Sequence, residues 1–128
     1  MRHLVAAALL FCAVAVPAAA QNSSGAVAKG YLVIEHSAPT AEAIEKLKPY
    51  SAATRPLLAR YGGRFVIASG KAEAVEGGWK PPFLVVIEFP TMAQARAFYD
   101  SAEYQAVLPI RLAALPDSRA FLIEGSAQ

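Results

Sequence analysis

The sequence predicts an α+β fold whose elements follow the order β-α-β-β-α-β. Four segments are rich in β-branched and aromatic residues, as strands are, and glycine, proline and small polar residues bound them. Two other stretches repeat apolar residues at helical spacing, one after the first strand and one after the third. This order is that of the ferredoxin-like fold, a four-stranded antiparallel sheet with the helices on one face.

The N-terminal end has the layout of a cleavable secretory signal peptide over residues 1–20. Basic residues precede an apolar run at 4–16, and small residues then lead up to Ala20. The apolar run is shorter than the roughly 20 residues that cross a bilayer. We therefore expect cleavage after Ala20. The mature protein would then be periplasmic or secreted and would not associate with the membrane. A flexible N-terminal arm is expected over residues 21–28, followed by a single domain over residues 29–128.

The composition argues against several kinds of partner and cofactor. The sequence contains twelve basic and ten acidic residues, and no run of basic residues occurs. Nucleic acid is therefore not an expected partner. The one cysteine, Cys12, lies in the predicted signal peptide, and the mature chain would keep a single histidine, His36. These residues are too few for a common zinc site, and no phosphate- or dinucleotide-binding glycine motif is present. We therefore expect neither a metal nor a cofactor.

The first strand and the first helix open the domain. Residues 31–36, YLVIEH, have the composition of a strand. Thr40 is a good N-cap for a helix that extends to Tyr61, where a glycine pair stops it. Two prolines inside this helix predict a kink or a break near Lys48, because proline removes a backbone donor and crowds the preceding turn.

The middle of the chain predicts a hairpin followed by a second helical region. Residues 63–75 and 83–89 are the second and third strands, joined by the irregular EGGWKPP loop. Thr91 begins a capping box that starts a helix, and Asp100 repeats the same spacing before a further short helix. The last strand is residues 119–125, RAFLIEG.

Both faces of the predicted sheet are apolar. Side chains alternate along a strand, and large apolar residues fill both sets of positions in the third and fourth strands. Helices can cover only one face, and a large exposed apolar sheet is a liability in a monomer. We therefore expect a homodimer joined through the uncovered faces of the two sheets, which is the arrangement of a dimeric α+β barrel.

A few ionisable residues interrupt the second apolar face. If the hairpin pairs symmetrically about its loop, Arg64 falls opposite Glu88, where opposite charges support each other. Glu124 and either Glu35 or His36 are expected on the same face. The pair can be a cross-strand ion pair, or it can bind a carboxylated ligand at the polar end of an apolar cleft.

Several segments together resemble a known bacterial family, the domain-of-unknown-function family numbered thirteen-thirty. The resemblance covers roughly Lys29 to Gly125 and lies in YGGRF at 61–65, EGGWKP at 76–81, LVVIEFPTMAQARAFYDSAEYQ at 84–105 and the closing FLIEG. It implies membership of the dimeric α+β barrel superfamily, with a ferredoxin-like fold and a sheet-to-sheet dimer. That superfamily includes monooxygenases, isomerases and haem enzymes, so the resemblance does not select a function. An exported chain departs from the family's more usual cytosolic-looking members.

Six residues are candidates for contacting a ligand. His36 and Glu88 are the candidate catalytic bases, although a rim histidine and an ion-paired carboxylate are equally ordinary structural features. Aromatic residues can wall a pocket or serve as core and dimer contacts. Arg111 can reach a ligand or the carboxyl end of its helix. The candidate ligand-binding set is Arg64, Glu88, His36, Tyr50, Trp79 and Arg111.

Three functions fit these residues. The first is an exported homodimer that binds a small organic molecule in a cleft lined by the sheet. The second is a cofactor-independent enzyme of the monooxygenase or isomerase type, in which replacing Glu88 or His36 abolishes turnover. The third is a purely structural or interaction module, in which replacing Arg64 or Glu88 weakens folding or dimerisation.

Overall fold

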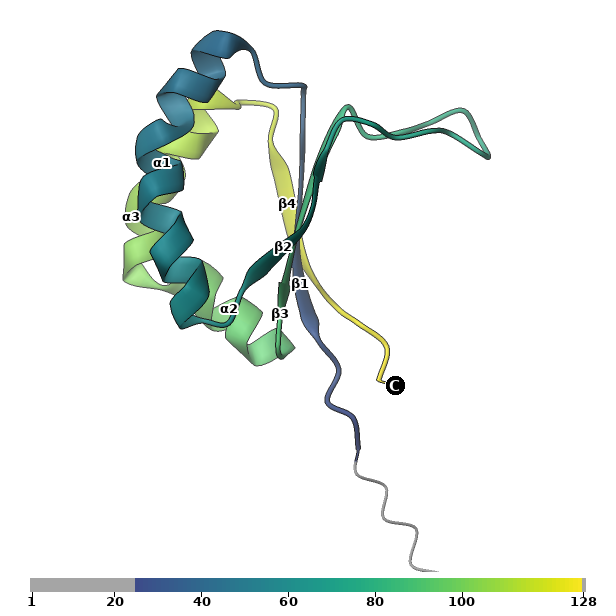
Figure 1. Ribbon diagram of the computed structural model, residues 1–128, viewed down its shortest axis with the longest axis vertical. Coiled ribbons are helices and arrows are strands. Elements are labelled where there is room, and N and C mark those ends of the chain that lie inside the picture. The colour runs from purple at the N-terminus through teal and green to yellow at the C-terminus, as the bar shows by residue number, and fades with distance from the viewer. Residues whose placement is uncertain (1–24, 128) are drawn as a thin grey trace, which may run out of the picture.

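The chain folds into two layers, a sheet and a layer of helices, in the computed structural model shown in Figure 1, which describes residues 25–127. The elements are β1 (Gly30–His36), α1 (Ala41–Arg60), β2 (Arg64–Ser69), β3 (Phe83–Phe89), α2 (Met92–Asp100), α3 (Ala102–Ala114) and β4 (Arg119–Glu124). The predicted ferredoxin-like arrangement is confirmed, with its second helical region divided into α2 and α3.

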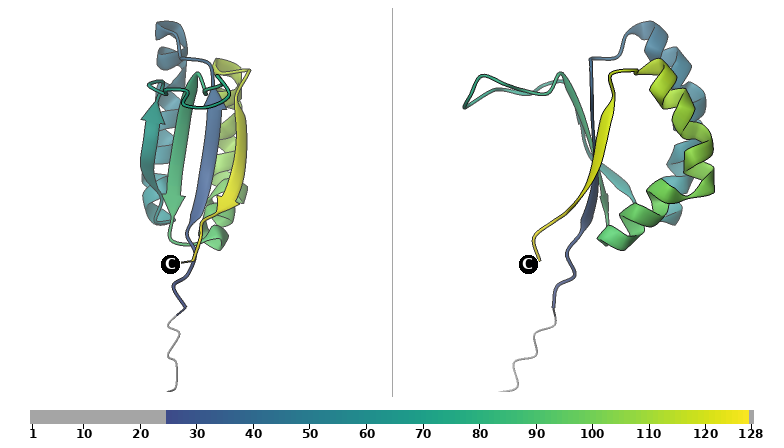
Figure 2. Two further views of the ribbon diagram at one scale, coloured as in Figure 1. Left: turned by 90° about the vertical axis from the view of Figure 1, so that its right-hand side faces the viewer. Right: turned by 180° about the vertical axis from the view of Figure 1, so that it is seen from behind.

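The four strands form one antiparallel sheet in the order β2-β3-β1-β4. Figure 1 shows the sheet edge-on, with all three helices on one side and the β2–β3 loop extending to the other. Figure 2 shows the face that carries no helix. We call the two sides the covered face and the uncovered face.

β1 lies between β3 and β4 and alternates between the two faces. Leu32 and Ile34 are buried on the covered face, whereas Tyr31 is half-buried on the uncovered one. Tyr31 stands opposite Glu88 of β3 and Ile123 of β4, which assigns the latter two residues to the uncovered face as well. Because β1 pairs with β3 and β4 in a regular register, each residue of β3 and β4 lies on the same face as the β1 residue opposite it.

The first helix begins and ends where the sequence predicts. The Thr40 hydroxyl accepts a hydrogen bond from the Ala43 amide at 3.1 Å and so satisfies one of the free donors at the helix start. At the other end Gly62 has a φ of 71°, a conformation that glycine adopts without a steric penalty.

Of the kink or break predicted near Lys48, the break does not occur. α1 continues through Pro49 and Pro56, and α3 likewise continues through Pro109. All three prolines lie on exposed sides of their helices. Water can therefore hydrate the carbonyl that loses its amide partner, so each proline weakens the helix without interrupting it.

Two predicted boundaries were wrong. The second strand ends at Ser69 and does not reach residue 75, because β3 starts only at Phe83 and the two prolines before it lack the amides that would extend the pairing. The N-cap of α3 is Ser101, whose hydroxyl accepts from the Tyr104 amide at 3.2 Å. Asp100 cannot serve as that cap because it is the last residue of α2.

The core lies between α2, the start of α3, the last turns of α1 with Leu57 and Leu58, and the covered face. Phe98 of α2 is its centre, with its ring centroid 5.3 Å from that of Phe89 and 4.6 Å from that of Tyr104. These three side chains are among the largest that are fully buried. Burial of such aromatic rings contributes much of the stability of a domain of this size.

The predicted signal peptide, its cleavage point after Ala20 and the first half of the predicted N-terminal arm lie outside the described residues. Residues 25–29 have no regular secondary structure. Within residues 25–127, no helix combines the length and the apolar character needed to span a membrane.

Replacing Gly30 by alanine should destabilise the fold, because α2 begins against this point of β1. A Cβ atom at Gly30 would lie 2.6 Å from both Met92 Cα and the Thr91 carbonyl oxygen, which are backbone atoms. Forced overpacking of this kind costs about 1–3 kcal/mol, and urea denaturation would measure it. Gly25→Ala is the control, since nothing lies within 4 Å of its Cβ. Equal stability of the two variants would contradict the close approach.

Candidate functional site

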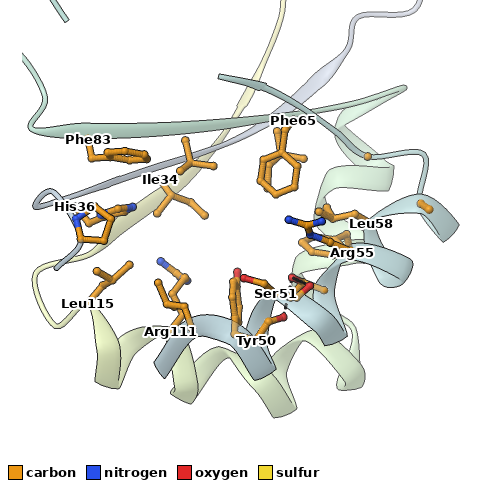
Figure 3. Close-up of a pocket in the computed structure, with 18 residues that line it drawn as sticks. Ile34, His36, Tyr50, Ser51, Arg55, Leu58, Phe65, Phe83, Arg111 and Leu115 are labelled. Atoms are coloured by element: carbon orange, nitrogen blue, oxygen red, sulfur yellow. Dashed lines mark hydrogen bonds between the residues drawn. The ribbon is translucent and has the colours of Figure 1, made fainter. Parts of the chain in front are cut away.

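A cavity of about 460 Å³ lies between the helices and the covered face of the sheet. Figure 3 shows side chains of the helices and strands pointing into it from opposite sides. The strands contribute mainly apolar residues, and α1 contributes one stripe at helical spacing. The α1 stripe is Leu47, Tyr50, Ser51, Thr54, Arg55, Leu58 and Ala59, and the strand residues are Ile34, His36, Phe65, Phe83, Val85 and Ile87.

The cavity exists because most of α1 does not rest on the sheet, although Leu57 and Leu58 near its end belong to the core. α1 packs along α3, whereas α2 packs on β1, β3 and β4 and so ties the helical layer to the sheet. Along the α1 stripe, positions that would be large and apolar in a packed core are small or polar, as Ser51 and Thr54 are. These side chains leave the space beneath α1 unfilled.

The edge of the cavity between α1 and β2 carries exposed side chains. Arg55 of α1 is exposed, and Phe65 of β2 is 53% exposed although both line the cavity. Figure 3 shows these two residues near each other at one end of the cavity. We take this end as its mouth.

Arg111 is the charged residue deepest in the cavity. Its side chain is 4% exposed, and Nη1 donates a hydrogen bond to Ser118 Oγ, while Nε has no hydrogen-bond partner. Among residues 25–127, no carboxylate lies within 4.0 Å of the guanidinium. Arg111 lies in the last turn of α3, where the helix dipole favours a cation by at most about 2 kcal/mol. Burying an unpaired ion costs several kcal/mol, so this compensation is incomplete.

Two tyrosine hydroxyls meet beside Arg111. The Tyr50 and Tyr104 oxygens are 3.1 Å apart, and Tyr104 is fully buried, whereas Tyr50 lines the cavity. Burial raises the pKa of the Tyr50 hydroxyl, an effect that the positive charge of Arg111 partly opposes. Tyr50 therefore stays a neutral phenol, which can donate a hydrogen bond as well as accept one.

His36 closes the cavity at the end of β1. It is 7% exposed, and its ring stacks on Phe83 with centroids 5.0 Å apart. Nδ1 lies 2.6 Å from the Ser37 carbonyl oxygen, which only a protonated Nδ1 can contact as a donor. In the neutral ring, Nε2 is then the acceptor, able to take a hydrogen bond or a proton from a bound molecule.

Arg64 and Glu88 lie on the uncovered face, away from the cavity. They are opposite each other in β2 and β3, as the symmetric hairpin predicts, and form an ion pair at 2.8 Å. Lys29 and the Tyr31 hydroxyl also donate to the Glu88 carboxylate, at 2.8 and 3.2 Å. Hydrogen bonds from Lys29 and then Arg64 lower the pKa of Glu88 to about 2.

The structure thus divides the predicted site residues into groups. His36, Tyr50 and Arg111 line one cavity on the covered face. Arg64 and Glu88 form a separate ion pair on the other face. Trp79 belongs to neither group, because it is 67% exposed in the β2–β3 loop.

Of the two alternatives expected in the first strand, Glu35 lies on the uncovered face, where it pairs with Arg119 at 3.0 Å, and His36 lies on the covered face. One assignment to the second face was wrong. Glu124 is opposite Gly30, which is in register with the buried positions of β1, so it does not share a face with Glu88. An error of one residue in counting along a strand is enough to reverse a face.

Sequence reasoning missed part of the cavity. Thr54, Ser51 and Arg55 were not among the candidates, although their spacing on α1 matches that of Tyr50 and Leu47. The sequence contained a usable pattern: small and polar residues occur on the side of the helix that is expected to face the core, which indicates a space there. No group of three or more His, Cys, Asp or Glu side chains suited to a metal ion occurs in the part of the chain that the structure describes.

Comparison with known sequences identifies one family. The model for the family described as Domain of unknown function (DUF1330) matches residues 29–126, which confirms the resemblance of the segments quoted above. No curated protein matches the chain.

Two of the solved structures that are similar in fold have TM-scores above 0.5 and different sources. One is a protein of unknown function from Rhodopseudomonas palustris, with a TM-score of 0.58 and 17% identity over 81% of this chain and 87% of that chain. The other is a dimeric ferredoxin-like protein of unknown function from Jannaschia sp. CCS1, with a TM-score of 0.55 and 13% identity over 75% of this chain and 98% of that chain. At such identities the likeness concerns the fold alone.

The Glu88 cluster should contribute a pH-dependent part of the stability. The pKa of Glu88 is depressed in the folded chain, so its contribution is complete above the unfolded value near 4.3 and is lost as the pH falls toward about 2. Urea midpoints measured from pH 6 to pH 2.5 should therefore fall less steeply for Glu88→Gln than for the wild type. Glu76→Gln is the control, because the Glu76 carboxylate makes no hydrogen bond or ion pair within residues 25–127. Identical slopes for Glu88→Gln and the wild type would refute this role.

Proposed function

The chain belongs to the DUF1330 family, and we propose that it is an exported homodimer that binds a small organic molecule in the cavity beneath α1. The observation that carries the binding function is the cavity itself, at about 460 Å³. Ligand sites of proteins are typically clefts of about 300–1,000 Å³ with mainly apolar walls and a few polar groups. The cavity meets this description with its strand residues on one side and Tyr50, His36 and Arg111 at its polar end.

A space of this size is not an ordinary packing defect. Protein interiors are packed about as densely as organic crystals. An engineered cavity of about 150 Å³ already takes up benzene, and this one, at about 460 Å³, is about three times as large. The polar stripe on α1 and the buried Arg111 also oppose simple collapse of the helix onto the sheet. We therefore take the space as a binding site.

The homodimer is supported by the uncovered face. Phe121 and Ile123 of β4 are 55% and 50% exposed there, and Ile67 of β2 is 43% exposed. Ion pairs stand on this face beside the apolar residues, Arg64 with Glu88 and Arg119 with Glu35. Protein interfaces usually combine apolar side chains with charged and polar ones in this way. The similar protein from Jannaschia sp. CCS1 is described as dimeric.

The β2–β3 loop supports the same arrangement. It extends from the sheet on the side away from the helices (Figure 1) and carries Val75 and Trp79, which are 88% and 67% exposed. Apolar side chains on a loop that extends in this direction would contact the second subunit if its sheet packed on the uncovered face. Export, in turn, rests on the signal-peptide layout of residues 1–20.

Blocking the cavity should abolish ligand uptake. We expect the neutral, apolar fluorophore N-phenyl-1-naphthylamine to bind the protein saturably, one molecule per chain. Ser51→Phe places a ring in the cavity and should weaken binding by about tenfold or more in a fluorescence titration, equivalent to about 1.4 kcal/mol. Leu112→Phe is the matched control, since Leu112 is exposed on α3 and does not line the cavity. Absence of saturable binding, or equal affinity of the two variants, would refute the proposed site.

A charge on the uncovered face should separate the subunits. The wild-type protein should sediment as a dimer at micromolar concentration, and Phe121→Glu should sediment as a monomer because the new carboxylate would be buried without a partner. Ile44→Glu is the control, because Ile44 is 50% exposed on α1 in the helical layer and should leave the dimer intact. A folded wild-type monomer under these conditions would overturn the proposed assembly.

A further inference from the structure

We propose that the molecule bound in the cavity carries a carboxylate group and that Arg111 anchors it. This inference rests on the proposed binding function and names the chemical class of the ligand. It starts from the guanidinium, which is 4% exposed and is the most buried charged group that lines the cavity.

The charge of Arg111 is not neutralised by the protein. Within residues 25–127, its one hydrogen bond is to a neutral hydroxyl, that of Ser118, and no acidic side chain is close enough for an ion pair. Nε has no partner at all. The carboxyl end of α3 supplies a partial charge of roughly half an elementary charge, which is less than the guanidinium carries. An anion in the cavity would complete the pairing that buried charges require.

The donors around Arg111 suit a carboxylate better than a larger anion. A guanidinium is planar and binds a carboxylate through two parallel hydrogen bonds. Tyr104 is fully buried, and its hydroxyl reaches Tyr50 at 3.1 Å. If Tyr104 donates in that bond, the Tyr50 hydroxyl is free to donate to a ligand. One deep guanidinium and one phenol thus offer a site for a single negative charge, whereas a phosphate dianion would need more donors.

The remainder of the cavity indicates an apolar body for this acid. Ile34, Phe83, Val85 and Ile87 form the wall on the sheet side, and Leu58 lies opposite on α1. Burying the hydrocarbon part of a ligand against this wall is favourable, and the wall has no hydrogen-bonding side chain for a second polar group. The expected ligand is therefore a monocarboxylic acid with an aromatic or aliphatic body that fits within the cavity.

The test compares an acid with its neutral isostere. Isothermal titration of the full-length protein with 4-phenylbutyrate and with 4-phenylbutanamide should show binding of the acid at least about tenfold tighter than binding of the amide. Arg111→Met should remove this preference and leave the affinity for the amide within about threefold of the wild-type value. Arg111→Lys, which keeps the charge without the planar fork, should fall between the two.

Controls separate the anchor from general effects of charge and folding. Arg96→Met removes an exposed arginine of α2 outside the cavity and should keep the full preference for the acid. Arg111→Met should melt no lower than the wild type, because it removes an unpaired buried charge. If that variant does not fold, Arg111→Lys takes its place, and an undiminished preference for the acid in Arg111→Lys would then overturn the anchor.

The outcomes distinguish this inference from the function on which it rests. Binding of the amide and of N-phenyl-1-naphthylamine without preference for the acid would overturn the carboxylate anchor and leave the binding site standing. A preference that survives in Arg111→Met would also overturn it. Failure of all three compounds to bind would overturn both proposals.

Discussion

The cavity depends on the aromatic contact between Phe98 of α2, Phe89 of β3 and Tyr104 of α3. This cluster joins the helical layer to the sheet at the α2 end, and the layer bows away from the sheet beyond it (Figure 1). Tyr104 also bonds Tyr50 and so connects the cluster to α1. Because aromatic rings keep a fixed thickness, the cluster sets a separation that the small side chains of α1 do not fill.

Much of the fold could be predicted from the residues because its signals are local. The glycine stop after α1, the caps at Thr40 and Thr91 and the alternating strands are each decided by side chains within a few positions. The failures have non-local causes. Whether Pro49 breaks a helix depends on which side of the helix meets water, and where β2 ends depends on where its partner strand begins.

The candidate site was harder to predict, because a site depends on which face each residue occupies. The opposition of Arg64 and Glu88 could be inferred from a hairpin, since register within a hairpin is nearly local. Placing His36, Tyr50 and Arg111 together required the distance between α1 and the sheet, and no short segment encodes that distance. Helical spacing could still have grouped Ser51 and Thr54 with Tyr50.

The helices all lie on one side of the sheet, and this has a consequence for a pair of subunits joined back to back. Their two cavities would lie on opposite sides of the paired sheets, each with its mouth at the edge between α1 and β2. The two cavities would still be connected through the strands that separate each of them from the neighbouring subunit. Val85 and Ile87 of β3 line the cavity, whereas Val86 between them lies on the opposite face. In such a dimer, one short segment of β3 would therefore contact both a molecule in the cavity and the neighbouring subunit.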